Sequence, residues 1–189
     1  MYAVIDVETG GFSKEKNGLC EVGIIFLDSN FKKVETFQST IKPYTRPDGI
    51  EPVSYKEDAM SVHGITMSEL NRSPEATEVA ETIERLLMEH GVTTIIAHNA
   101  VTMDKAWIEY FLERFGNGFK FKETICTLEI ARKASLPIPD NRLSTLLEYF
   151  RIPIENAHRA LDDAEATLSL FMKLNYKEIK SERQVLNNY

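Results

Sequence analysis

The stretch that decides the fold is YAVIDVETG, residues 2–10 at the start of the chain. Tyr2–Glu8 is rich in β-branched and apolar residues, which predicts a strand. Side chains two residues apart in a strand point to the same face, so Asp6 and Glu8 project together, beside the apolar Val4. Adjacent like charges repel each other. The face of the strand that carries Asp6 and Glu8 is therefore predicted either to be exposed to solvent or to bind a cation through both carboxylates.

Two further strands are predicted directly after the first. Leu19–Leu27 is almost entirely apolar, and Phe31–Ile41 follows it after a short polar turn, Asp28-Ser29-Asn30. We expect the three strands to form an antiparallel meander. The loop Gly10–Gly18 would join the first two.

Helices and strands alternate in the rest of the chain. Thr66 and Glu69 have the spacing of a capping box, which predicts a short helix, and Ser73-Pro74 predicts the start of a longer helix that ends at Gly91. Further helices are predicted at Met103–Phe115, Leu143–Phe150 and Ala157–Leu174, strands at Thr93–Ala97 and Phe121–Cys126, and an irregular segment at Pro43–Ser61. The order predicts an α/β fold with a mixed sheet. The length predicts one domain, residues 1–174, with 175–189 as a C-terminal tail or an extension of the last helix.

Composition limits the classes of function. The chain has 22 Lys and Arg against 29 Asp and Glu, a net charge of −7, which argues against binding long nucleic acid through its phosphates. The net charge is compatible with binding the end of a nucleic-acid strand in a cleft that holds metal ions. Apolar runs such as Val22–Leu27 are too short to span a membrane. Without a signal-peptide pattern at the start, we expect a cytoplasmic protein with Cys20 and Cys126 as buried thiols.

Asp104 stands out because of the helix it begins. The apolar residues of that helix lie three, four, seven, eight and eleven positions later, so Asp104 shares their face. These are Trp107, Ile108, Phe111, Leu112 and Phe115. A carboxylate on an apolar face is costly unless it is paired or binds a metal. The alternative is an interaction with the helix dipole, with Thr102 as the N-cap.

The last helix offers two aspartates, and helical geometry separates them. Asp163 falls about 100° from Ala164, at the rim of the buried stripe, whereas Asp162 falls on the opposite side, toward solvent. His158 comes five residues before Asp163, so we expect it on the loop or first turn that leads into this helix.

Taken in order, these residues resemble a known family. D-x-E-T-G from Asp6, His98-Asn99-Ala100 followed by Asp104, and His158-x4-Asp163 resemble the DEDDh subgroup of the DnaQ-like 3′-5′ exonucleases. The segment Val62–Thr66 also resembles that family, and the likeness covers nearly the whole chain. It implies a ribonuclease-H-like fold, with a five-stranded mixed sheet flanked by helices.

The resemblance also implies roles for single residues. Asp6, Glu8, Asp104 and Asp163 would hold two Mg²⁺ or Mn²⁺ ions, with Asp6 bridging them, and His158 would be the general base. Histidine suits this role because its unperturbed pKa is about 6.5. The pocket for the 3′-terminal nucleotide would be lined by Thr9, Gly10, Val62, His63 and Met103. Met103 departs from the family, since many relatives have an aromatic residue there, and His63 has the alternative of a structural polar residue.

The substrate expected from the resemblance is the 3′ end of single-stranded DNA, from which nucleoside 5′-monophosphates would be released. Two alternatives stay open. The first is an exoribonuclease that trims RNA, because the chemistry takes place at phosphate in either case. The second is a proofreading subunit or module bound to a DNA polymerase.

Overall fold

The predicted meander forms one half of a five-stranded sheet. The computed structural model describes residues 1–154 and 157–186, and side chains as far as Leu174. Strands β1 (Tyr2–Thr9), β2 (Leu19–Leu27) and β3 (Lys33–Thr40) pair antiparallel, as expected. Strands β4 (Thr94–Ala97) and β5 (Glu123–Cys126) add in parallel beside β1. The sheet order is β3-β2-β1-β4-β5, which confirms the mixed sheet.

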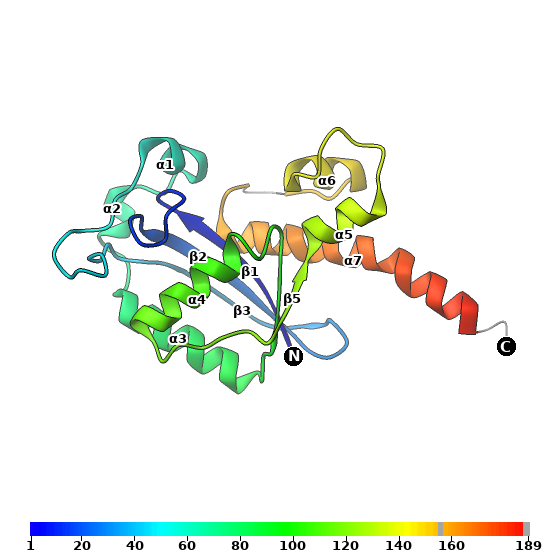
Figure 1. The fold of residues 1–189 in the computed structure, drawn as a ribbon, viewed down its shortest axis with the longest axis horizontal. Helices are drawn as coiled ribbons and strands as arrows, with labels where there is room; N and C mark the ends of the chain where they lie inside the picture. The colour runs from blue at the N-terminus through cyan, green and yellow to red at the C-terminus, as the bar shows by residue number, and fades with distance from the viewer. Residues whose placement is uncertain (155–156, 187–189) are drawn as a thin grey trace.

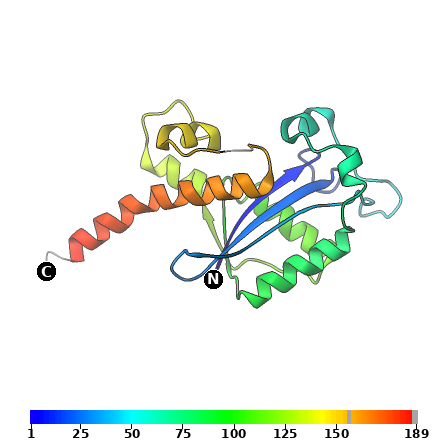
Figure 2. The ribbon, with the colours of Figure 1, turned by 180° about the vertical axis from the view of Figure 1, so that it is seen from behind.

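Helices cover both faces of the sheet (Figures 1 and 2). On one face, α3 (Ala76–Glu89) and α4 (Asp104–Phe115) pack on Ala3, Ile5 and Val7 of β1. On the other face, α7 (Ala160–Leu186) packs through Ala164 and Phe171 on Val4 and Ile25. The alternation of β1 side chains between the two cores places Asp6 and Glu8 on the α7 face.

Smaller helices stand at the two sides of the end of β1 (Figure 1). On one side are α1 (Glu57–His63) and α2 (Met67–Leu70). On the other are α5 (Thr127–Ala134) and α6 (Leu143–Phe150), which pack against α7 in a separate apolar cluster. Thr66 caps α2 as predicted, since its hydroxyl accepts a hydrogen bond from the Glu69 amide at 3.1 Å.

The structure corrects several predicted boundaries. Residues 57–61 are helical in α1, although Pro43–Ser61 was predicted to be irregular. The last proline of that segment, Pro52, lies before the helix, and Gly64 in a left-handed conformation ends it. Helix α5 was not predicted, because it begins at Thr127 directly after β5, with no turn residue to mark its start. Helix α3 begins at Ala76 rather than at Ser73, and α7 begins at Ala160 rather than at Ala157.

Two predictions about the chain as a whole can be compared with the described residues. Cys20 and Cys126 are both buried and free, which confirms the predicted thiols. Among the helices described, none combines the length and apolar character needed to cross a membrane. The backbone of 175–186 continues α7, which agrees with the predicted extension of the last helix rather than with a separate tail. Residues 187–189 lie outside the described residues.

Candidate active site

The acidic residues predicted from separate motifs come together at the end of β1. Asp6 and Glu8 lie on β1 and are half-buried. Asp104 is the first residue of α4 and is 4% exposed, and Asp163 lies in the first turn of α7 and is 9% exposed. Burial of this kind is rare for an unpaired aspartate. Four carboxylates from three elements therefore converge on one region.

The pKa values of the four carboxylates are raised by burial and by their neighbours' charges. Burial raises the pKa of Asp6 well above its usual value, and the charges of Asp104, Asp163 and Glu8 raise it further. Burial and Asp163 raise the pKa of Glu8 to about 8. Burial raises the pKa of Asp104 to about 7, although the backbone amides of Asp104 and Val7 oppose the rise. Burial also raises the pKa of Asp163.

Such a group fits divalent cations. Without a metal, the raised pKa values favour the protonated carboxyl groups, whereas bound cations would favour the ionised ones. One side-chain ligand atom from each of Glu8, His158 and Asp163 lies within 4.8 Å of the other two. Carboxylate oxygens are the ligands that Mg²⁺ and Mn²⁺ prefer. The donor set present in the chain is therefore suitable for these ions.

His158 lies on the turn that leads into α7, as predicted. It has a left-handed backbone, with φ of 68°, and its side chain is exposed. Its backbone N–H donates to Oδ2 of Asp163 at 3.1 Å, which fixes the turn against the helix. The imidazole can thus reach both solvent and the carboxylates.

Burial agrees with the choice between the two aspartates of α7. Asp163 is buried, and Asp162 is half-buried rather than fully exposed. The proposed N-cap of α4 was wrong, because the N-cap is Met103 and the Thr102 hydroxyl instead donates to Oδ1 of Asn99 at 2.8 Å. Asp104 is nevertheless in the first turn of α4, where the helix dipole favours a negative charge.

The sequence did not indicate the ion pair that anchors the turn of His158. Glu21 lies opposite Glu8 across β1 and β2 and is 1% exposed. Nε of Arg159 donates to both oxygens of Glu21 at 3.2 and 3.1 Å, and Nη2 donates to Oε1 at 2.6 Å. The Ala160 amide donates to Oε2 at 3.0 Å. Burial tends to raise the pKa of Glu21, but these donors hold it below its usual value. The sequence signal that could have indicated this pair is Glu21 itself, an acidic residue in an otherwise apolar strand.

Gly23 permits the close packing of α7 on the sheet. It lies opposite Asp6 in β2. A Cβ at Gly23 would come within 2.3 Å of the backbone of Ala160 and Leu161. Any larger residue would therefore push the start of α7, with Asp163, away from Asp6.

The residues predicted to hold a terminal nucleotide lie on three elements: Thr9 and Gly10 at the end of β1, Val62 and His63 in α1, and Met103 at the start of α4. His63 is 7% exposed; its Nδ1 accepts a hydrogen bond from the Ile65 amide at 3.1 Å, while its Nε2 is buried without a partner among the described residues. Val62 is 56% exposed and Met103 is half-buried against the core of α3 and α4.

The backbone of Gly10 is less available than expected. Its N–H donates to the Gly18 carbonyl and its carbonyl accepts from the Lys56 amide, both at 2.8 Å, and the Thr9 hydroxyl donates to the Gly11 carbonyl at 2.9 Å. These bonds stabilise the loop after β1. Gly10 is also buried, against Tyr55, so neither of its backbone groups is free for a nucleotide.

A cavity of about 470 Å³ lies on the opposite, α6 side of the carboxylates. His158 and Asp163 form part of its wall, and the rest is mostly apolar. The apolar lining residues are Leu143, Leu147, Ile152, Ile154 and Ala157. The apolar wall makes this cavity suitable for an apolar or aromatic group beside the carboxylates.

Comparison with known proteins places the chain in one protein family. The family model described as RNase_T, Exonuclease, matches residues 3–171. The "3'-5' exonuclease DinG" of Staphylococcus epidermidis is 31% identical over 173 residues, which are 91% of this chain and 18% of that protein. The "DNA polymerase III PolC-type" of Clostridium perfringens is 28% identical over 184 residues, 97% of this chain and 12% of that protein. The chain thus spans under a fifth of the length of either relative.

A solved structure confirms the fold. E. coli Exonuclease I, in complex with a dT13 oligonucleotide, superposes with a TM-score of 0.77 and 19% sequence identity. The match covers 98% of this chain and 43% of that one. The five-stranded mixed sheet with flanking helices is therefore the ribonuclease-H-like architecture expected from the sequence.

Proposed function

The chain belongs to the RNase T/DnaQ-like exonuclease family, and we propose that it is a metal-dependent 3′-5′ exonuclease of the DEDDh subgroup. The observation that carries this proposal is the convergence of Asp6, Glu8, Asp104 and Asp163, with His158 on the adjoining turn. The exonuclease domain would comprise residues 1–174.

The four carboxylates would hold two Mg²⁺ or Mn²⁺ ions. When bound, such ions would stabilise the negative charge that develops on the phosphate and on the leaving 3′-oxygen. His158 would accept the proton of the attacking water and pass it to bulk solvent, to which its side chain is exposed. Its closeness to Glu8 and Asp163 also allows a role as a ligand. The general-base assignment therefore predicts that metal binding survives its removal.

Thr9, Val62, His63 and Met103 would contact the terminal nucleotide. Support comes from the contact of α1, which carries Val62 and His63, with β1, which carries Asp6 and Glu8. The buried, unpartnered Nε2 of His63 is a polar atom that a nucleotide could satisfy.

We propose single-stranded DNA as the substrate, because the Exonuclease I structure that matches this fold is a complex with dT13. Parallel digestion of DNA and RNA strands of one sequence would test this choice. Faster digestion of RNA would favour the trimming exoribonuclease instead. The similarity to the PolC-type polymerase supports a second candidate, a proofreading module. Co-purification with a polymerase would favour that candidate.

The decisive experiment follows the label from a single-stranded oligonucleotide. With Mg²⁺, a 3′-labelled strand should release its label at once as a mononucleotide, and a 5′-labelled strand should shorten stepwise. EDTA should stop both reactions. Asp6→Ala should abolish activity, and Asp162→Asn is the matched control that should retain it. Activity in Asp6→Ala, or label release from the 5′ end first, would refute the proposal.

A further inference from the structure

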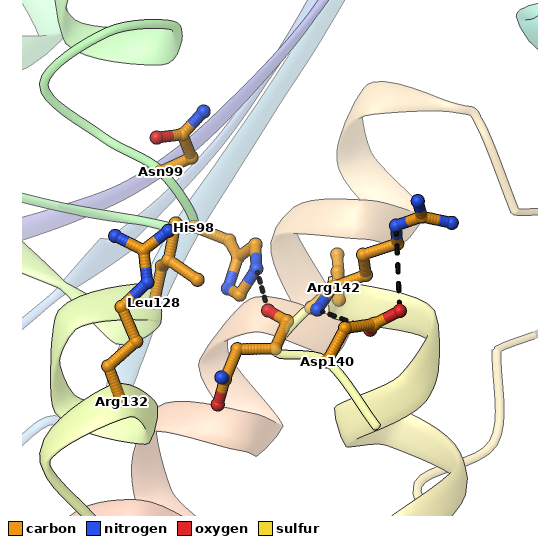
Figure 3. A pocket seen from close by; sticks show the side chains of 8 residues that line it. His98, Asn99, Leu128, Arg132, Asp140 and Arg142 are labelled. Atoms are coloured by element: carbon orange, nitrogen blue, oxygen red, sulfur yellow. Dashed lines mark hydrogen bonds and ion pairs between the residues drawn. The ribbon is translucent and has the colours of Figure 1, made fainter. Parts of the chain in front are cut away.

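A second cavity, of about 530 Å³, lies between α5 and the start of α6 (Figure 3). Its size falls within the roughly 300–1,000 Å³ of small-ligand pockets. Eight residues line it: His98, Asn99, Leu128, Arg132, Asp140, Asn141, Arg142 and Leu143. None of them belongs to the set of carboxylates described above.

Two of the polar lining residues hold the walls in place. The ring of His98 bonds to the Thr127 hydroxyl at 2.9 Å and to the Asn141 carbonyl at 3.1 Å, so it ties the start of α5 to the segment before α6. Oδ1 of Asp140 accepts from the Arg142 amide at 3.0 Å and from the Thr145 hydroxyl at 2.7 Å. His98 and Asp140 are therefore engaged within the protein.

The side chains of Arg132 and Arg142 do not hold the walls together by hydrogen bonds as His98 and Asp140 do. Figure 3 shows Arg132 and Arg142 on opposite sides of His98. Among the side chains that the structure describes, Arg132 makes no hydrogen bond or ion pair. The guanidinium of Arg142 meets only Asp140, at 3.6 Å, and its side chain is 82% exposed. In a chain of net charge −7, two available guanidinium groups at one cavity indicate an anionic ligand.

The position of the cavity indicates which anion. Leu143 lines both this cavity and the one that contains His158 and Asp163, so the two are neighbours. Helices α1 and α6 lie on either side of the end of β1 (Figure 1). A strand whose last nucleotide lies on the α1 side and which crosses the carboxylates toward α6 would pass the two arginines.

We propose that this cavity, with Arg132 and Arg142, binds backbone phosphates of the single-stranded DNA upstream of the bond that is cut. The proposal rests on the exonuclease function proposed above. Guanidinium groups bind phosphate through paired, charge-assisted hydrogen bonds. Base identity would not matter here, because phosphate contacts position a strand without reading its sequence.

The test compares a long and a minimal substrate. The double variant Arg132→Ala/Arg142→Ala is assayed on dT12 and on the p-nitrophenyl ester of thymidine 5′-monophosphate, which has a single phosphodiester and cannot reach the cavity. Lys14→Ala/Lys105→Ala removes the same charge from a hollow beside α4 and is the matched control. Binding of 5′-fluorescein-dT12 is measured in Ca²⁺ at several salt concentrations.

The arginine variant should lose about tenfold or more in kcat/KM on dT12, with unchanged turnover of the ester. The salt slope of dT12 binding should fall by about 1.4, as expected for two lost contacts to a single strand. An equal loss on both substrates, no loss on dT12, or a larger loss in the lysine control would overturn the proposal. If the wild type cleaves neither substrate, the exonuclease function fails. The binding measurement then still decides whether the arginines hold a strand.

Discussion

Replacing Arg159 by alanine should destabilise the protein markedly, although Arg159 makes no contact with substrate in the proposed mechanism. Its guanidinium makes three hydrogen-bond contacts with Glu21, whose side chain is 1% exposed. Breaking a buried ion pair by removing one partner costs roughly 3–5 kcal/mol, because the remaining charge is left buried without compensation.

Two features place the expected loss at the lower end of that range. Glu21 keeps the Gln38 side chain, at 2.9 Å, and the Ala160 amide, at 3.0 Å, as donors. The side chain of Arg159 is 37% exposed, so its own desolvation is incomplete. We therefore expect a loss of about 3 kcal/mol in the free energy of unfolding.

Urea denaturation followed by far-ultraviolet circular dichroism measures this loss. Arg85→Ala is the control, since Arg85 forms an exposed pair with Glu89 one helical turn away and should cost less than about 0.5 kcal/mol. Glu21→Ala alone and together with Arg159→Ala completes a double-mutant cycle. The reasoning is refuted if Arg159→Ala lies within about 1 kcal/mol of the wild type or if the two changes are simply additive.

Three further predictions concern the site. His158→Ala should lower kcat by about 10²–10⁴-fold and leave Mn²⁺ binding by calorimetry unchanged; lost binding would identify His158 as a ligand. The raised pKa values of Glu8, about 8, and Asp104, about 7, mean that the metal-free folded state binds more protons than the unfolded chain from about pH 4 upward. The contribution of these groups to stability is present below about pH 4 and is lost by about pH 8. In EDTA, the Tm of Asp104→Asn should therefore rise relative to the Tm of the wild type as the pH increases. A difference independent of pH would contradict this. Gly23→Ala should cost about 1–3 kcal/mol and reduce activity, because the new Cβ would meet Ala160 at 2.3 Å; an active variant of normal Tm would show that α7 can shift without consequence.

Local sequence patterns were sufficient for most elements of the fold. The strands β1 and β2 and the helix α6 were predicted within one residue, because each has a clear period or run of apolar residues. The position of Asp104 on the apolar face of its helix was also readable, as was the greater burial of Asp163 compared with Asp162. In each case the signal comes from residues on one element.

The predictions that were wrong concern segments with weaker local sequence signals. Helix α1 follows a segment with three prolines, and α5 begins at Thr127 directly after β5 ends at Cys126, so no turn residue marks its start. Thr102 had the right residue type for an N-cap, but Asn99 competes for its hydroxyl. The loop of Gly10 uses its backbone groups internally, through Gly18 and Lys56, and no local pattern indicates those partners.

The sequence by itself determined which residue types could hold metal and the elements on which they lie. Only the tertiary structure decided that Glu21 pairs with Arg159, 138 positions away, and that Arg132 and Arg142 face one cavity beside the site. Strand pairing and the packing of α7 on the sheet bring these residues together. Such contacts depend on long-range burial, for which no spacing along the chain is a sufficient guide.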